Sequence, residues 1–322
     1  MEKKKTGEEV ELHVVNEGRI AAVTPKQKLY TERDFKRLAK GFQPILREEM
    51  AQISVAVGDT IQVSRSLQLE GYNPAAINMA NQYRPGGGYL EGSMAQEESL
   101  CRRSFLHHYL IANLDWYPME TRGGCIYNPD VLVFRSPEAE GCKTLDEPFE
   151  LAFLTCAAPS RPELRNKRFE IGRFGLNKEA NDFISGVISQ HIGEIDKTLL
   201  FSRDVENEFV EKIRSILLVA LDNGHDSVVL GAWGCGAFGC PALQVALLHR
   251  RVIFSDPRFL YGFRKIVFAI IEDNNSRGRH NLKGNVFPFQ LVFSDLCPLP
   301  SLDPSSSSSA DVPSSSFDPH PD

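Results

Sequence analysis

The sequence lacks the features that mark a membrane-spanning, secreted or zinc-binding protein. No stretch approaches the roughly 18 consecutive apolar residues of a spanning helix. The lysines at positions 3–5 are not followed by the apolar segment of a secretory signal. The seven cysteines contain no C-x-x-C pair, so neither a disulfide framework nor a zinc site is indicated. We therefore expect an intracellular protein, cytoplasmic or nuclear, with no bound metal and no contact with a membrane.

The chain also lacks an excess of positive charge. It has 36 Lys and Arg against 42 Asp and Glu, which gives a formal net charge of −6. Direct binding to nucleic acid is therefore not expected, and an anionic ligand must be held by local donors. With 322 residues, of which 42% are hydrophobic, the chain is long enough to bury a full core as a monomer.

Composition divides the chain into three parts. Residues 297–322 form a tail, and Ser, Pro and Asp make up 17 of its last 22 residues. Such a segment cannot bury enough apolar surface to offset its ordering entropy, so we expect it to be disordered. Residues 1–30 form an N-terminal extension that is expected to be partly disordered, and residues 31–296 are expected to make one domain.

Short apolar runs alternate with helical stretches along this domain. Strands are expected near residues 53–57, 75–80, 131–134, 151–155, 227–231 and 263–271. Helices are expected over 31–50, 59–69, 93–113 and 207–223, and from residue 241 onward. This alternation predicts an α/β fold with a mixed, mostly parallel sheet covered by helices. The segment 159–201 is less regular, and we make no assignment for it.

Two glycine-rich turns each follow a predicted strand and precede a predicted helix. The residues concerned are Gly86, Gly87 and Gly88 in the first turn and Gly234, Cys235, Gly236, Ala237, Phe238 and Gly239 in the second. Glycines let the backbone approach a ligand closely, and ligands of open α/β sheets bind where such turns meet. Backbone N–H groups hold anions, so the pair of turns would suit a diphosphate. The alternative for each turn is a tight connection without function, and neither is a P-loop, because no Gly-Lys-Ser/Thr follows.

Two adjacent glutamates, Glu97 and Glu98, lie shortly after the triple glycine. Ser93 and Gln96 form a capping-box pattern, which predicts a helix start here and places both glutamates in the first turn. Acidic residues there also favour the helix dipole, which is the purely structural alternative. The functional alternative is that one carboxyl is a general acid whose pKa is raised by burial, by its neighbour and by a bound anion.

These residues together resemble a known family. The triple glycine after Pro85, then seven residues, then Gln96-Glu97-Glu98 and Ser-Leu-Cys-Arg-Arg-Ser, resembles the signature of microbial-type poly(ADP-ribose) glycohydrolases. The strand that carries Asn78, the strand that ends at Thr155 and the second glycine-rich turn are also similar to that family. The resemblance covers about residues 30 to 295. It implies a macrodomain-like fold, with the sheet sandwiched between helices and an N-terminal helical extension.

The family resemblance also implies an activity. It implies hydrolysis of the ribose–ribose bonds of poly(ADP-ribose), with release of ADP-ribose and without a cofactor. Glu98 would protonate the leaving oxygen and help to activate water, while Glu97 would hold ribose hydroxyls. The implied ADP-ribose ligands are Asn78, Gly86, Gly87, Gly88, Gln96, Gly234, Cys235, Gly236, Ala237, Phe238 and Gly239. ADP-ribosylated proteins would be the partners, and reversal of ADP-ribosylation in the DNA damage response the setting.

Two other functions stay open at the level of the sequence. One is a module that binds ADP-ribose without cleaving it, and the presence of both Glu97 and Glu98 argues against it. The other is hydrolysis of mono-ADP-ribosyl conjugates. Residues 81–84 are bulkier and more basic than we expect in the family, and no asparagine follows Pro159. The preferred chain end and the exact substrate therefore stay open as well.

Overall fold

The computed structural model describes residues 27–120, 122, 124–167, 169–191, 198–273, 276, 281 and 283–296. The predicted tail, residues 297–322, lies outside the described residues, as do residues 1–26 of the predicted N-terminal extension.

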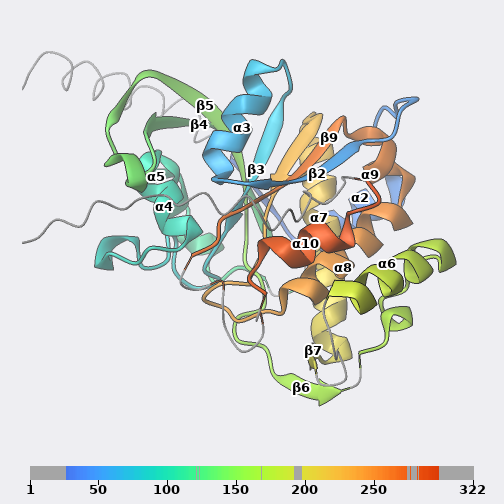
Figure 1. The fold of residues 1–322 in the computed structure, drawn as a ribbon. Helices are drawn as coiled ribbons and strands as arrows, with labels where there is room; N and C mark the ends of the chain where they lie inside the picture. The colour runs from blue at the N-terminus through green and yellow to red at the C-terminus, as the bar shows by residue number, and fades with distance from the viewer. Residues whose placement is uncertain are drawn as a thin grey trace, which may run out of the picture.

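A mixed seven-stranded sheet forms the centre of the described domain (Figure 1). Its strands are β1 (Lys28–Tyr30), β2 (Gln52–Val57), β3 (Pro74–Met79), β4 (Cys125–Arg135), β5 (Thr144–Cys156), β8 (Ser227–Leu230) and β9 (Lys265–Ile270). They lie in the order β1-β4-β5-β3-β8-β9-β2. The β1–β4 and β4–β5 pairs are antiparallel, and the rest are parallel. The carboxyl ends of the parallel strands therefore lie at one edge of the sheet, where loops can form a binding site.

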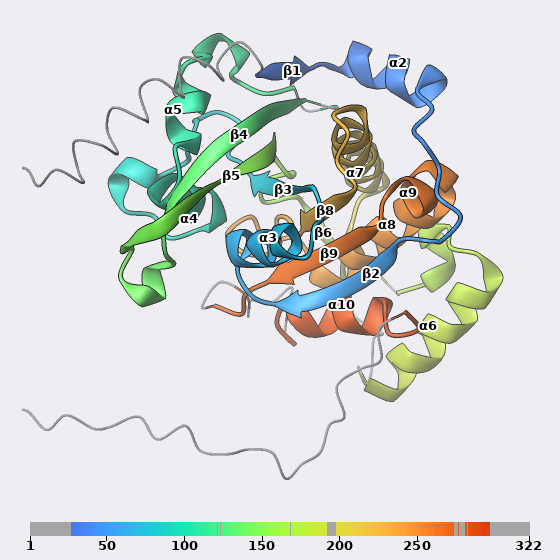
Figure 2. The same cartoon turned by 90° about the horizontal axis from the view of Figure 1, so that it is seen from above.

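Helices cover both faces of this sheet (Figure 2). One face carries α3 (Thr60–Leu69), α4 (Gln96–Arg103) and α5 (Leu106–Ile111), and the other carries α7 (Arg203–Asp222), α8 (Ala242–Ser255) and α10 (Val286–Val292). Two further helices pack on this second layer, α2 (Glu32–Gly41) beside α7 and α9 (Pro257–Gly262) beside α8. This arrangement confirms the predicted α/β fold with a mostly parallel sheet between helices.

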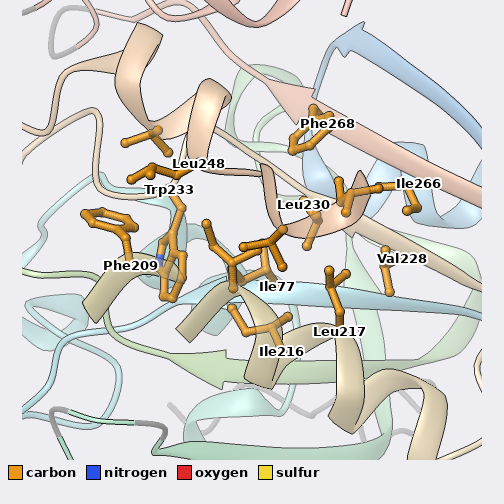
Figure 3. Close-up of a cluster of buried hydrophobic side chains, with 14 of the residues drawn as sticks. Ile77, Phe209, Ile216, Leu217, Val228, Leu230, Trp233, Leu248, Ile266 and Phe268 are labelled. Atoms are coloured by element: carbon orange, nitrogen blue, oxygen red, sulfur yellow. The ribbon is translucent and has the colours of Figure 1, made fainter. Parts of the chain in front are cut away.

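The core consists of two apolar layers, one on each face of the sheet. Successive strand residues alternate between them: Ala76 and Val229 face the α3 layer, whereas Ile77 and Leu230 face the layer of α7 and α8. Figure 3 shows Ile77 and Leu230 among side chains that include Trp233, which is fully buried. Because both faces are covered, the central strands are continuous apolar runs in the sequence.

The helix predicted over residues 31–50 is wrong beyond Gly41. Helix α2 starts after the N-cap Thr31, whose side chain accepts a hydrogen bond from the Asp34 N–H, and it ends at Gly41. Glycine weakens a helix, and Pro44 has no N–H to continue one. Residues 42–51 instead run to β2 in an irregular connection.

The single helix predicted over residues 93–113 is also wrong. The chain forms α4 and α5, and between them Ser104 is extended, with φ −145° and ψ 174°. Ser104 forms a bridge to Val133 of β4, and the Phe105 N–H donates to the Leu132 carbonyl at 3.0 Å. Pairing with the sheet therefore interrupts the helix, and no local signal in the sequence shows it.

Some other predicted boundaries are confirmed within one residue, but α7 begins at Arg203, four residues before the predicted start at 207, and β4 and β5 extend well beyond the predicted runs 131–134 and 151–155. The Asp59 side chain caps α3 by accepting the Gln62 N–H at 2.9 Å. Gly224 follows α7 with a φ of +75°, which suits a residue without a Cβ. Pro241 was expected at the first helical position but is the N-cap, because α8 begins at Ala242.

The segment that the sequence left unassigned forms a small subdomain beside α7 and α8. Its elements are β6 (Leu164–Lys167), the 3-10 helix η5 (Ile171–Phe174), α6 (Lys178–His191) and β7 (Thr198–Phe201). Other short 3-10 helices lie outside this subdomain: η2 (Tyr89–Glu91), η3 (Leu114–Trp116) and η4 (Glu138–Glu140). β6 and β7 pair antiparallel. At one edge of the large sheet, β1 lies in the segment predicted to be an N-terminal extension. It nevertheless belongs to the domain, because it pairs with β4 and its Tyr30 is fully buried.

The ion pair between Asp59 and Arg103 yields a stability prediction. Arg103 is 1% exposed, and its Nη1 lies 2.5 Å from Asp59 Oδ2. Asp59→Asn keeps a capping oxygen but removes the charge that faces the guanidinium. We expect the free energy of unfolding to fall by about 3–5 kcal/mol, measured by urea denaturation.

A double variant provides the control for this prediction. Asp59→Asn with Arg103→Met removes both charges and should be more stable than Asp59→Asn alone. If Asp59→Asn unfolds at the wild-type urea concentration, the buried pair does not have the importance that we assign to it.

Candidate active site

Helix α4 presents two adjacent buried carboxylates at its N-terminus. Glu97 is 3% exposed and Glu98 is 7% exposed. The predicted capping box is wrong, because α4 has Ala95 as N-cap and no side-chain cap. The Gln96 side chain instead accepts the Met79 N–H at 2.8 Å and donates to the Ile77 carbonyl at 2.7 Å. Gln96 thereby fastens the start of α4 to the carboxyl end of β3.

The Glu97 carboxylate accepts three hydrogen bonds from β3 and the loop that follows it. Its Oε1 accepts from Asn78 Nδ2 and from the Gly86 N–H, both at 3.2 Å. Its Oε2 accepts from the Asn81 N–H at 2.7 Å. A carboxylate oxygen has two acceptor sites, so one site of Oε2 is still available.

The Glu98 carboxylate is bound at one oxygen only. Its Oε1 accepts the Gly88 N–H at 2.8 Å. Its Oε2 is buried and has no hydrogen-bond partner among the described residues. Buried polar atoms without partners are rare in folded proteins and call for an explanation.

The middle residue of the triple glycine, Gly87, has no room for a side chain because the two carboxylates lie so close to it. Gly87 has a φ of +57°, and a Cβ built on it would lie 2.4 Å from Glu98 Oε1 and 3.2 Å from Glu97 Oε2. All three N–H groups of the turn donate within the protein: Gly86 to Glu97, Gly87 to the Arg84 carbonyl and Gly88 to Glu98. Two of the three amides of the first turn therefore bind the protein's own carboxylates.

Burial dominates the electrostatics of Glu97. It raises the pKa of Glu97 to about 8, and the neighbouring Glu98 adds to the increase. The hydrogen bonds from Asn81, Asn78 and Gly86 act in the opposite direction. Because burial outweighs them, Glu97 titrates close to neutral pH.

The second glycine-rich turn lines a large cleft at the same edge of the sheet. The cleft has a volume of about 520 Å³. Its wall includes Gly236, Ala237 and Phe238, and no described residue accepts a hydrogen bond from the N–H groups of these three residues. Gly234 also lines the cleft with a φ of +77°, and a Cβ on it would lie 2.9 Å from Cys240 Sγ. The second turn therefore offers amides that have no acceptor in the part of the chain that the structure describes, whereas the amides of the first turn are paired.

Asn281 holds this second turn in place. Its Nδ2 donates to the carbonyls of Cys235 and Cys240 at 3.1 and 3.2 Å. Its Oδ1 accepts the Ala242 N–H at the start of α8. One buried side chain thus connects both ends of the turn to the helix that follows it, and no local pattern in the sequence marks Asn281 for this role.

The structure brings the predicted residues together at one edge of the sheet, in two groups. The cleft is lined by Gln96, Gly234, Gly236, Ala237 and Phe238, and the carboxylate cluster contains Asn78, Gly86, Gly87, Gly88, Glu97 and Glu98. Met79 and Gln96 line the cleft and join the two groups. Cys235 and Gly239 belong to the second turn but are not among the cleft-lining residues.

Several residues that line the cleft were not predicted. They are Asp59, Thr60 and Gln62 after β2, Pro137, Glu138 and Ala139 between β4 and β5, and Ile271, Asp273, Ser276 and Asn285 after β9. What these residues share is their place in the chain, because they lie in the segments that follow β2 and β9 or connect β4 to β5. That place is the signal that could have identified them. Asp59 was identified only as a helix cap.

The remaining candidates do not assemble into a second chemical centre. Burial raises the pKa of Cys235 and Cys240 well above the usual value of a thiol, which opposes a role as nucleophile. Within the described ranges, no three His, Cys, Asp or Glu side chains are placed to hold a metal ion. In the same ranges, no helix combines the length and apolar character needed to cross a bilayer.

The raised pKa of Glu97 predicts a pH-dependent stability. Between the usual glutamate value of 4.5 and about 8, the folded protein keeps a proton that the unfolded chain releases. Folding stability should therefore fall as pH rises through this window, by up to about 1 kcal/mol per pH unit. Glu97→Gln should remove that slope, measured by urea unfolding at pH 5, 6, 7 and 8.

A matched control is available for this experiment in the same loop. Glu91 is exposed, so Glu91→Gln should keep the wild-type slope. Equal slopes for wild type and Glu97→Gln would contradict the assignment of a raised pKa to Glu97.

Comparison with known proteins relates this geometry to a family. Residues 3–136 match the family model for the catalytic domain of microbial-type PARG. No curated protein sequence matches the chain significantly.

Solved structures match most of the chain. Poly(ADP-ribose) glycohydrolase from Thermomonospora curvata, bound to the inhibitor ADP-HPD, is 26% identical over 84% of this chain and 86% of that chain, with a TM-score of 0.60. The enzyme from Deinococcus radiodurans in complex with ADP-ribose is 24% identical over 86% of this chain and 98% of that chain, with a TM-score of 0.61. Residues 3–136 thus match the microbial-type PARG catalytic domain, and most of the chain has the macrodomain-like α/β fold of bacterial poly(ADP-ribose) glycohydrolases.

Proposed function

We propose that this protein hydrolyses the ribose–ribose O-glycosidic bonds of poly(ADP-ribose) and releases ADP-ribose. The observation that carries the proposal is the pair of buried glutamates, which accept hydrogen bonds from the Gly86 and Gly88 amides, beside a cleft whose wall includes three amides with no acceptor among the described residues. The family match over residues 3–136 and the likeness to bacterial poly(ADP-ribose) glycohydrolases support it.

The cleft would bind ADP-ribose through its second glycine-rich turn. None of the described lining residues is Lys or Arg, so the diphosphate must be bound by neutral donors. The N–H groups of Gly236, Ala237 and Phe238 supply them, as backbone amides do in other anion sites. The half-buried Phe238 ring would contact the ribose or the adenine.

Glu98 would act as the general acid. A proton on its carboxyl belongs on Oε2, because Oε1 already accepts the Gly88 N–H. Transfer of that proton to the leaving ribose oxygen accompanies cleavage of its bond to the anomeric carbon. The resulting Glu98 carboxylate takes a proton from water, whose oxygen bonds to the anomeric carbon.

Glu97 would orient the substrate rather than transfer the proton. Three N–H donors occupy most of its acceptor sites, and the remaining site on Oε2 suits a ribose hydroxyl. Such fixed hydrogen bonds favour a reactive geometry of the substrate and lower the entropic cost of the reaction.

The role of Glu98 is tested by substitution with its amide. Glu98→Gln should lower turnover of poly(ADP-ribose) by about 10²–10⁴-fold, because the variant has no proton to transfer. It should still bind ADP-ribose, as measured by calorimetry. Turnover at the wild-type rate would refute the assignment.

The two alternative functions are tested with the wild-type protein. Binding of ADP-ribose without turnover would indicate a binding module. Release of ADP-ribose from mono-ADP-ribosylated protein but not from polymer would indicate the other substrate class.

A pair of glycine variants tests the packing of the triple glycine on the carboxylates. Gly87 and Gly92 both have positive φ, +57° and +82°, so alanine is strained at either position. Only at Gly87 would the new Cβ also meet a carboxylate oxygen. We expect Gly87→Ala to lower turnover by about 100-fold through misplacement of Glu98, and Gly92→Ala to have a much smaller effect. Equal effects would mean that loop strain alone matters.

A further inference from the structure

A chain of buried polar side chains lies behind the carboxylate cluster. Asn78 Nδ2, which donates to Glu97, also donates to Thr155 Oγ1 at 3.2 Å. Thr155 Oγ1 accepts a second hydrogen bond, at 3.1 Å, from Asn128 Nδ2. Asn128 Oδ1 in turn accepts from Gln27 Nε2 at 2.7 Å. Asn78, Thr155 and Asn128 are each 0% exposed, so this chain crosses the core from the site toward β1.

The sheet itself fixes the geometry of this chain. Asn78 on β3 and Thr155 on β5 are register partners, so their side chains point to the same face of the sheet. Asn128 lies on β4, the next strand beyond β5. Buried polar groups in three neighbouring strands are costly unless each one is paired. Their arrangement therefore calls for an explanation beyond packing.

The effect of the chain is to orient one carboxamide. Both protons of Asn78 Nδ2 are used, one toward Glu97 and one toward Thr155. The Asn78 Oδ1 atom is buried and has no partner among the described residues. Thr155 can hold Asn78 in this orientation because Asn128 donates to the same hydroxyl oxygen and thereby fixes its position.

We propose that Thr155, held by Asn128, is a positioning residue for the proposed hydrolase. It keeps Nδ2 of Asn78 toward Glu97 and leaves Oδ1 as the acceptor for a substrate hydroxyl. This inference rests on the proposed function, and it adds two residues that do not touch the substrate.

Loss of the Thr155 acceptor has a predictable chemical consequence. Without it, the Asn78 carboxamide is free to turn over and present Oδ1 to Glu97. That arrangement favours the protonated form of Glu97, because a protonated carboxyl can donate to Oδ1. The titratable groups that face Glu97 are Glu98 and Cys101 from α4 and Tyr117 from the segment after η3. Substitution at residue 155 changes none of them.

The experiment compares Thr155→Val with Thr155→Ser. Valine has the shape of threonine but no acceptor, whereas serine keeps the hydroxyl. We expect Thr155→Val to lower kcat on poly(ADP-ribose) by about 10- to 100-fold. We also expect the limb of the pH–rate profile that reports Glu97 to move to higher pH. Thr155→Ser should keep a kcat and a pH–rate profile close to those of the wild type. Equal impairment of the two variants, or an unchanged profile in Thr155→Val, would overturn the proposal.

Two further variants separate positioning from general damage. Ser227 is a fully buried residue at the start of β8, whereas the site lies at the carboxyl ends of the parallel strands. Ser227→Ala should therefore leave kcat and the pH–rate profile unchanged. Asn128→Leu removes the donor that holds Thr155 and should shift the profile in the same direction as Thr155→Val. It serves as the test if Thr155→Val does not fold.

A readout without turnover separates this proposal from the proposed function. The pH window over which folding stability falls should extend to higher pH in Thr155→Val than in the wild type. If the wild type does not cleave the polymer, the proposed function fails, yet this shift still tests the link from Thr155 to Glu97. If the wild type cleaves the polymer and neither the stability window nor the pH–rate profile moves, only the positioning role fails.

Discussion

The architecture of this site depends on the burial of two neighbouring carboxylates under a turn of three glycines. Removing carboxylates from water is costly, and here N–H groups of Asn78, Asn81, Gly86 and Gly88 offset the cost. These donors come from β3 and the loop after it, whereas the carboxylates come from α4. Strand, loop and helix must therefore be in place together before any of the polar groups is satisfied, which couples the geometry of the site to the folding of the domain.

The two glycine-rich turns use the same chemistry for different ends. In the first turn, two of the three amides are paired with the protein's own carboxylates, so the turn holds Glu97 and Glu98 in position. In the second turn, three successive amides have no acceptor among the described residues, so they are available to an anion. Under the proposed function, this division would let a chain with a net charge of −6 bind a diphosphate without a lining Lys or Arg in the described cleft.

The sequence predicted what local patterns encode and missed what tertiary contacts decide. The cap at Asp59 and the apolar strand runs are local signals, and the structure confirms them. Ser93 and Gln96 have the spacing of a capping box, but the Gln96 side chain instead forms hydrogen bonds with the Met79 N–H and the Ile77 carbonyl of β3. The grouping of the glutamates with both turns was predictable from their positions after parallel strands. The role of Thr155 was not predictable, because its contact with Asn78 depends on the register between β3 and β5, which the sequence does not show.

The two glutamates are adjacent on one helix, yet their carboxylates accept different numbers of hydrogen bonds. Glu97 accepts three hydrogen bonds, whereas Glu98 accepts one and keeps a buried oxygen without a described partner. Three fixed donors hold Glu97 rigidly and leave one acceptor site on its Oε2, which suits the orienting role proposed for it. A carboxyl with one bound and one free oxygen has a defined orientation and an open site for proton transfer. The count of donors therefore supports the proposed assignment of Glu98 as acid and Glu97 as orienting group, in addition to the family signature.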